Sequence, residues 1–187
     1  DDDYVHIKQI DPNVAAAAFY RLYQLTARNL KSDRAAEASS EALTLALLDR
    51  MEACACEDKP SLNAYGLVNA LCSLSYFSKI RNAPQQVENS IQTRQLSQIL
   101  VNQIDQSPEQ IFRGLRPARL VDLLRALHVL GFGKAVENDF NHNNMCPAAS
   151  RIQSQICQKL VLGNVLDQLS AGDMSVALAT LAGVAQP

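Results

Sequence analysis

The sequence predicts an all-α fold, arranged as an α-solenoid of stacked antiparallel helical hairpins. Leu and Ala dominate the composition, while Gly and Pro number only 7 each in 187 residues, which favours helices. Apolar residues recur at the 3.6-residue period of an amphipathic helix. Four such patterns begin at Ala15, Leu67, Leu120 and Met174, at successive offsets of 52, 53 and 54 residues. Because no alternating strand pattern competes, the repetition indicates about three and a half helical hairpins.

The first helix of each hairpin carries apolar residues at i, i+3, i+4, i+7 and i+10, which fall along one side of a helix. In chain order they are Ala15, Ala18, Phe19, Leu22 and Leu25; Leu67, Ala70, Leu71, Leu74 and Phe77; Leu120, Leu123, Leu124, Leu127 and Leu130; and Met174, Ala177, Leu178, Leu181 and Val184. Capping residues or prolines precede these stripes, in Asp11-Pro12-Asn13, Pro60-Ser61-Leu62-Asn63, Arg116-Pro117 and Ser170-Ala171-Gly172-Asp173. Capping and periodicity therefore predict the same four helices.

The second helix of each hairpin is predicted from a shorter apolar pattern. These residues are Leu43, Leu47, Leu48 and Met51; Leu96, Ile99, Leu100 and Ile104; and Ile152, Ile156, Leu160 and Val161. A polar segment precedes each pattern, and we interpret residues 31–40, 80–93 and 134–150 as loops. The third pattern continues through Val165, Leu166 and Leu169, so this helix is either longer than the others or broken near Gly163.

The predicted hairpins cover residues 12–58, 61–106 and 116–169, followed by a terminal helix over residues 172–185. A lone hairpin cannot bury its apolar stripe, so we expect residues 1–187 to form one helical-repeat array. The terminal helix is expected to pack on a neighbouring protein subunit, within a larger protein or complex. An unrelated globular helical bundle, in which any four amphipathic helices resemble one another, is the alternative.

The sequence favours a non-enzymatic role. It contains no Gly-rich phosphate loop, nucleophile elbow or metalloprotease helix, and we interpret Asp105 and Glu109 as a solvated pair. Cys54 and Cys56 lack a matching second pair of ligands, so neither a metal nor a cofactor is expected, and the cysteines are interpreted as reduced thiols. No apolar run reaches the length of a membrane span.

Positive charge is concentrated in one segment, although the chain as a whole has a net charge of −2. Residues 113–134 carry four arginines and Lys134 against the single acid Asp122. Arginine forms bidentate contacts with phosphate and stacks on bases, so the candidate RNA-binding residues are Arg113, Arg116, Arg119 and Arg125. The first three recur every third residue and share one side if that turn is helical. Alternatively, the four are solvated or pair with acidic residues of a neighbouring repeat.

Two segments of the chain resemble segments of a known group of proteins. They are LVNALCSLSYF at residues 67–77 and LVDLLRALHVLGF at residues 120–132. They are similar to the leucine-rich helices of organellar helical-repeat RNA-binding proteins. These are the octotricopeptide and heptatricopeptide repeat proteins and the FAST-kinase-like proteins that often carry a RAP domain. The repeat interval here is longer, and no segment resembles a RAP domain. The resemblance implies an RNA-binding groove near Asn69, Asp122 and Ser175.

The resemblance also implies a location and a role. The expected location is an organelle, the mitochondrial matrix rather than the plastid, and the expected partner is organellar rRNA or mRNA. The predicted function is a non-catalytic helical-repeat RNA-binding module, either an accessory subunit of the mitochondrial ribosome or an organellar RNA maturation factor. The alternative is a protein–protein scaffold subunit of a large organellar complex without RNA contact, which the net acidity favours.

Overall fold

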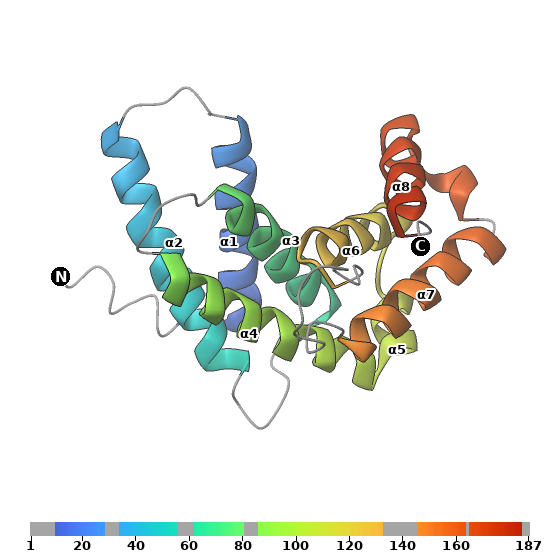
Figure 1. Cartoon of the computed structure of the whole chain (residues 1–187), viewed down its shortest axis with the longest axis horizontal. Coiled ribbons are helices and arrows are strands. Elements are labelled where there is room, and N and C mark those ends of the chain that lie inside the picture. The colour runs from blue at the N-terminus through green and yellow to red at the C-terminus, as the bar shows by residue number, and fades with distance from the viewer. Residues whose placement is uncertain are drawn as a thin grey trace. The chain divides into compact units, whose positions relative to one another are not determined.

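The computed structural model describes residues 10–28, 34–55, 62–80, 86–132, 146–163 and 165–184 (Figure 1). Within these ranges the regular structure is helical and no strand occurs, which confirms the predicted all-α class. The helices are α1 (Pro12–Arg28), α2 (Arg34–Ala55), α3 (Ala64–Ile80), α4 (Gln86–Gln106), α5 (Pro108–Arg113), α6 (Pro117–Val129), α7 (Pro147–Leu162), the 3₁₀ turn η4 (Leu166–Gln168) and α8 (Ala171–Val184).

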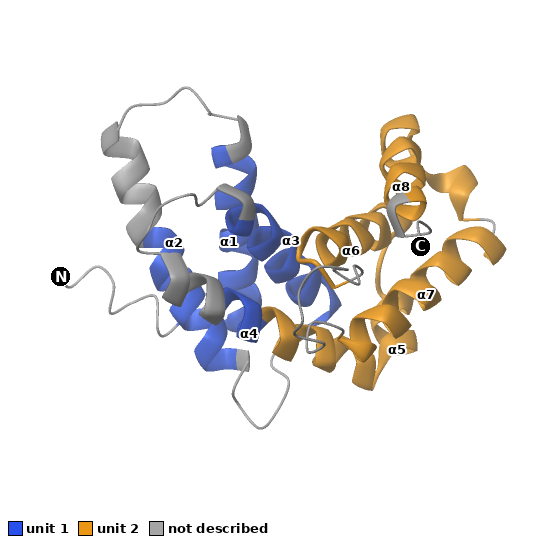
Figure 2. Cartoon of the chain, viewed as in Figure 1, with its two compact units in different colours: residues 1–96 blue, residues 97–187 orange. Residues whose placement is uncertain are grey.

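Two compact units divide the chain, residues 1–96 and residues 97–187, which we call the N-terminal and C-terminal units (Figure 2). The N-terminal unit contains α1, α2, α3 and the first part of α4. The C-terminal unit contains the remainder of α4 and the helices α5 to α8. A single continuous array over the whole chain stays a prediction.

In the N-terminal unit, α1 packs against both α2 and α3. The predicted stripe of α3 is buried along its whole length, from Leu67 to Phe77. Phe19 of α1 is fully buried and stacks on Phe77, with ring centroids 5.3 Å apart and ring planes inclined by 8°. Because two aromatic rings remove a large apolar area from water, this pair anchors α1 to α3.

Some predicted stripe residues are exposed instead of buried: Ala18, Leu25, Leu43, Val161 and Leu178. In α1 the buried side includes Ala15, Ala16 and Phe19, so Ala16 takes the place predicted for Ala18. Residues 15–18 are four consecutive alanines. A run of identical small residues has no apolar period, so it leaves the rotation of the helix undetermined.

Side-chain caps confirm the predicted starts of α1 and α3. Asp11 Oδ1 accepts hydrogen bonds from the backbone N–H groups of Asn13 at 2.9 Å and Val14 at 3.2 Å. Asn63 Oδ1 accepts one from the N–H of Gly66 at 2.9 Å. The two starts are also joined, because Asn13 Oδ1 accepts a hydrogen bond from the N–H of Asn63 at 2.8 Å. Asn13 therefore ties the first turn of α1 to the beginning of α3.

Gly66 is the residue that allows this close approach. A Cβ atom there would lie 2.6 Å from Asn13 Oδ1, which cannot move without losing its bond from Asn63. We expect Gly66→Ala to lower the free energy of unfolding by about 1 kcal/mol, despite the better helix propensity of Ala. Chemical denaturation measures this cost. In an Asn13→Ala background the same substitution should cost less, and equal costs in both backgrounds would contradict the explanation.

In the C-terminal unit, α6 packs against both α7 and α8. The buried side of α6 includes the predicted Leu120, Leu123, Leu124 and Leu127. Helix α7 contributes buried aliphatic side chains at Ile152, Ile156 and Leu160. These stripe residues of α6 and α7 lie in the core of this unit together with Leu100 and Ile104 of α4.

A Schellman turn ends α6. Gly131 has a φ of +80°, which favours glycine, and its N–H donates to the His128 carbonyl at 3.2 Å. The N–H of Phe132 donates to the Leu127 carbonyl, also at 3.2 Å, and the Phe132 side chain is buried. The Gly-Phe pair after the predicted stripe therefore stops the helix and returns an aromatic ring to the core.

The predicted loops were too long. Helices α2, α4 and α7 begin at Arg34, Gln86 and Pro147, inside the segments predicted as loops. Polar composition suggested loops there, but Ala, Glu and Gln in these segments are good helix formers. Residues 31–33, 81–85 and 134–145 lie outside the described residues. Helix α7 ends before Gly163 and is followed by η4, so the broken alternative is the correct one.

Candidate nucleic-acid interface

The arginine-rich segment folds as a short helix, a turn and the start of α6. Helix α5 opens with Pro108 at its first position and Glu109 in its first turn, both favourable at a helix N-terminus. It ends at Arg113 and is capped by Gly114, whose N–H donates to the Ile111 carbonyl at 3.2 Å. Arg116 then has extended φ and ψ angles of −70° and 153°, and α6 follows it. The segment is not one continuous helix, so helical spacing does not place its arginines on one side.

Arg119 is engaged in an ion pair. Its Nη1 atom donates to Asp122 Oδ2 at 2.7 Å, and the Arg119 side chain is only 15% exposed. Of the four candidate RNA-binding residues, Arg119 is therefore the one whose charge is compensated within its own helix. The predicted alternative was an acid of a neighbouring repeat, whereas Asp122 lies three residues away on the same helix.

The other three candidates are exposed. Arg113 ends α5, Arg116 is the residue before α6, and Arg125 lies on α6. Within the described part of the chain, none of their side chains makes an ion pair or a hydrogen bond. Arg125 follows Arg116 by nine residues, which is about half a turn around the helix axis. Arg116 and Arg125 therefore lie on different sides of the α6 axis, and the three arginines do not form one row.

A further arginine, which the charge pattern did not single out, is also paired. Arg151 of α7 donates from Nε to Asp105 Oδ1 of α4 at 3.2 Å and from Nη2 to the second carboxylate oxygen. These hydrogen bonds raise the pKa of the Arg151 guanidinium. The interpretation of Asp105 as a solvated carboxylate was wrong, because its side chain is 19% exposed and held by this bidentate contact.

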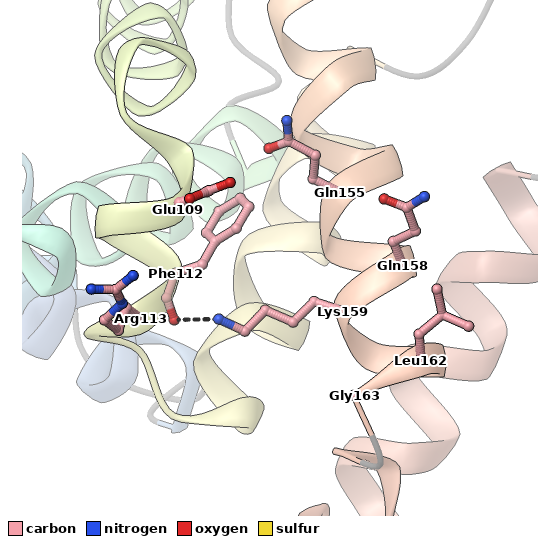
Figure 3. A pocket seen from close by; sticks show the side chains of 8 residues that line it. All are labelled: Glu109, Phe112, Arg113, Gln155, Gln158, Lys159, Leu162 and Gly163. Atoms are coloured by element: carbon pink, nitrogen blue, oxygen red, sulfur yellow. Dashed lines mark hydrogen bonds between the residues drawn. The ribbon is translucent and has the colours of Figure 1, made fainter.

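A cleft of about 610 Å³ lies between α5 and α7 (Figure 3). Its α7 wall consists of residues spaced i, i+3, i+4 and i+7, and its α5 wall of residues spaced i, i+3 and i+4. Lys159 crosses between the helices, since its Nζ atom donates to the Phe112 carbonyl at 3.1 Å. The lining residues are Glu109, Phe112, Arg113, Gln155, Gln158, Lys159, Leu162 and Gly163.

The cleft has two chemically different ends. Figure 3 shows Glu109 and Gln155 at one end and Lys159 with Leu162 at the other. Arg113 lines the cleft, but its guanidinium is directed away from α7. Phe112 is buried beneath the cleft, whereas Leu162 is 76% exposed at its edge. One end can therefore accept hydrogen bonds, and the other presents a cation.

Sequence reasoning missed this cleft. The relevant signal was the polar stripe of Gln155, Gln158 and Lys159, which shares a helix with the apolar stripe already identified. Its significance depends on α5, a helix of only 6 residues that is too short to show an apolar period. Without α5, the stripe on α7 is typical of an ordinary solvated helix surface.

Other predicted positions are placed without forming a common site. Asn69 is half-buried, Asp122 is paired with Arg119, and Ser175 is exposed. Among the residues that the structure describes, no three His, Cys, Asp or Glu side chains lie together in a way that would hold a metal ion. No helix in the described ranges has both the length and the apolar character to cross a membrane.

In comparisons with known proteins, the chain matches no protein-family model, no curated protein and no solved structure.

Proposed function

We propose that this chain is a non-catalytic helical-repeat module that binds RNA. The supporting observation is the contrast among its arginines. Arg113, Arg116 and Arg125 are exposed and have no partner among the residues that the structure describes, whereas Arg119 is held by a carboxylate. An unpaired guanidinium has no protein anion to give up when it binds a phosphate, and it releases the counterions condensed on the nucleic acid.

The proposal assigns the phosphate contacts to the three exposed arginines. Arg119 instead holds Asp122 at 2.7 Å, so it stabilises the first turns of α6 and adds little free positive charge. The wider setting rests on the resemblance of residues 67–77 and 120–132. It is a role in the mitochondrial matrix, as an accessory subunit of the ribosome or as an RNA maturation factor, within a helical-repeat array.

Charge removal at Arg116 and Arg125 tests the RNA contact. We expect Arg116→Gln with Arg125→Gln to reduce affinity for a labelled single-stranded RNA on the order of tenfold at low salt. Fluorescence anisotropy measures the affinity. The matched control is Arg21→Gln with Arg94→Gln, which removes the same charge from exposed residues of the N-terminal unit. Equal losses in the two double variants would contradict a role for this surface.

A second candidate is the scaffold role without RNA contact. It is favoured by α8, whose exposed side carries Leu178, 58% exposed, beside Ser175, Ala179 and Ala182 and no charged residue. An uncharged helix surface with an exposed leucine is typical of protein–protein contacts. Crosslinking in the native assembly separates the two roles, since RNA joined to residues 113–125 supports binding and protein alone at that segment supports the scaffold.

A further inference from the structure

The cleft between α5 and α7 is lined by hydrogen-bonding side chains that play no part in the phosphate contacts proposed for the exposed arginines. Its volume of about 610 Å³ lies within the range of small-ligand sites, roughly 300–1,000 Å³. At one end, the carboxylate oxygens of Glu109 accept hydrogen bonds. The side-chain amide of Gln155, at the same end, can both donate and accept hydrogen bonds. This combination suits a ligand edge that carries N–H donors next to carbonyl or ring-nitrogen acceptors.

The other end of the cleft suits an anion. Lys159 Nζ has three N–H donors and uses one of them on the Phe112 carbonyl at 3.1 Å. That bond holds the ammonium group between the two helices, and its remaining donors can reach a bound ligand. Glu109 and Phe112, whose carbonyl holds the ammonium group, are three positions apart on α5, which is nearly one helical turn along the backbone.

We propose that this cleft receives one unstacked nucleotide of the bound RNA. The base edge lies against Glu109 and Gln155, and the nucleotide's phosphate lies against Lys159. This inference rests on the proposed function, and it adds a base preference to it. A nucleotide with an exocyclic amino group presents the N–H donors that the carboxylate requires and carries the anion that the ammonium requires. RNA-binding proteins commonly read single-stranded bases through such edge contacts.

Comparing the affinities for cytosine and uracil distinguishes base recognition in the cleft from general phosphate binding. Cytosine presents an amino donor at the position where uracil presents a carbonyl acceptor. The Glu109 carboxylate should therefore favour cytosine, and we expect the full chain to bind oligo(C) on the order of tenfold more tightly than oligo(U). In Glu109→Gln the amide can serve either base, so the ratio of the two affinities should fall to about one.

The matched control is Asp167→Asn, which makes the same change of charge at an exposed residue of η4 outside the cleft. This variant should keep the preference for oligo(C), with affinities measured by fluorescence anisotropy at fixed salt.

Arginine-dependent binding that does not distinguish the two oligonucleotides would overturn the inference and leave the proposed function standing. If neither oligonucleotide binds, both fail. A peptide that contains Lys and Glu is a second probe of the cleft. If Glu109→Gln abolishes binding of this peptide but leaves binding of oligo(C) unchanged, the inference is also overturned.

Discussion

Phe19→Ala is expected to destabilise the N-terminal unit by about 3–5 kcal/mol, the cost typical of deleting a buried aromatic side chain. Phe19 is 0% exposed, and its ring stacks on Phe77 with the planes inclined by 8°. The substitution removes the apolar contact between α1 and α3 and leaves a cavity that the two helices cannot fill without moving. Urea denaturation followed by circular dichroism of the full chain should show the loss.

Leu25→Ala is the control for this substitution, because Leu25 lies on the same helix and is 42% exposed. A partly solvated side chain contributes little on deletion, so its cost should stay near 0.5 kcal/mol. Since both residues belong to the stripe predicted for α1, the comparison tests which side of α1 faces the core. Similar costs for the two variants would show that the described packing of α1 on α3 is wrong.

Leu124→Ala should lower the free energy of unfolding of the C-terminal unit by about 2–5 kcal/mol. Leu124 is 0% exposed on α6, the helix that packs against both α7 and α8. Loss of its side chain therefore weakens the packing of α6, the helix that contacts both of the others. Hydrogen exchange of the full chain should show reduced protection of the backbone amides of α6, because these amides become exposed when the C-terminal unit unfolds.

Leu178→Ala provides the same chemical change at a residue of α8 that is 58% exposed. We expect a cost of about 0.5 kcal/mol, which leaves the fold of the isolated chain intact. A loss as large as that of Leu124→Ala would mean that the exposed side of α8 is covered in solution.

The helices that sequence reasoning predicted best have long, unambiguous apolar stripes. The stripe of α3 from Leu67 to Phe77 is buried as predicted, and four of the five stripe residues of α6 are buried. In these segments leucines alternate with polar or small residues at helical spacing, so only one rotation buries the large side chains. The Asp11 cap and the Asn63 cap then set where α1 and α3 begin.

Prediction was poorer where composition alone guided it. Polar segments before α2 and α4 were interpreted as loops, although helix propensity does not require apolar residues. The candidate arginines were found from their charge, but charge spacing could not show that Arg119 is paired. Pairing depends on side-chain geometry, and the cleft depends on a helix of 6 residues beside a polar stripe distant in sequence.

The salt dependence of RNA affinity tests the central claim most directly. The slope of the logarithm of the association constant against the logarithm of salt concentration counts the phosphate contacts, at about 0.7 for each contact with a single strand. The account predicts that replacing Arg113, Arg116 and Arg125 with Gln makes this slope shallower by about 2. A triple variant whose slope and affinity equal those of the unaltered chain would contradict it.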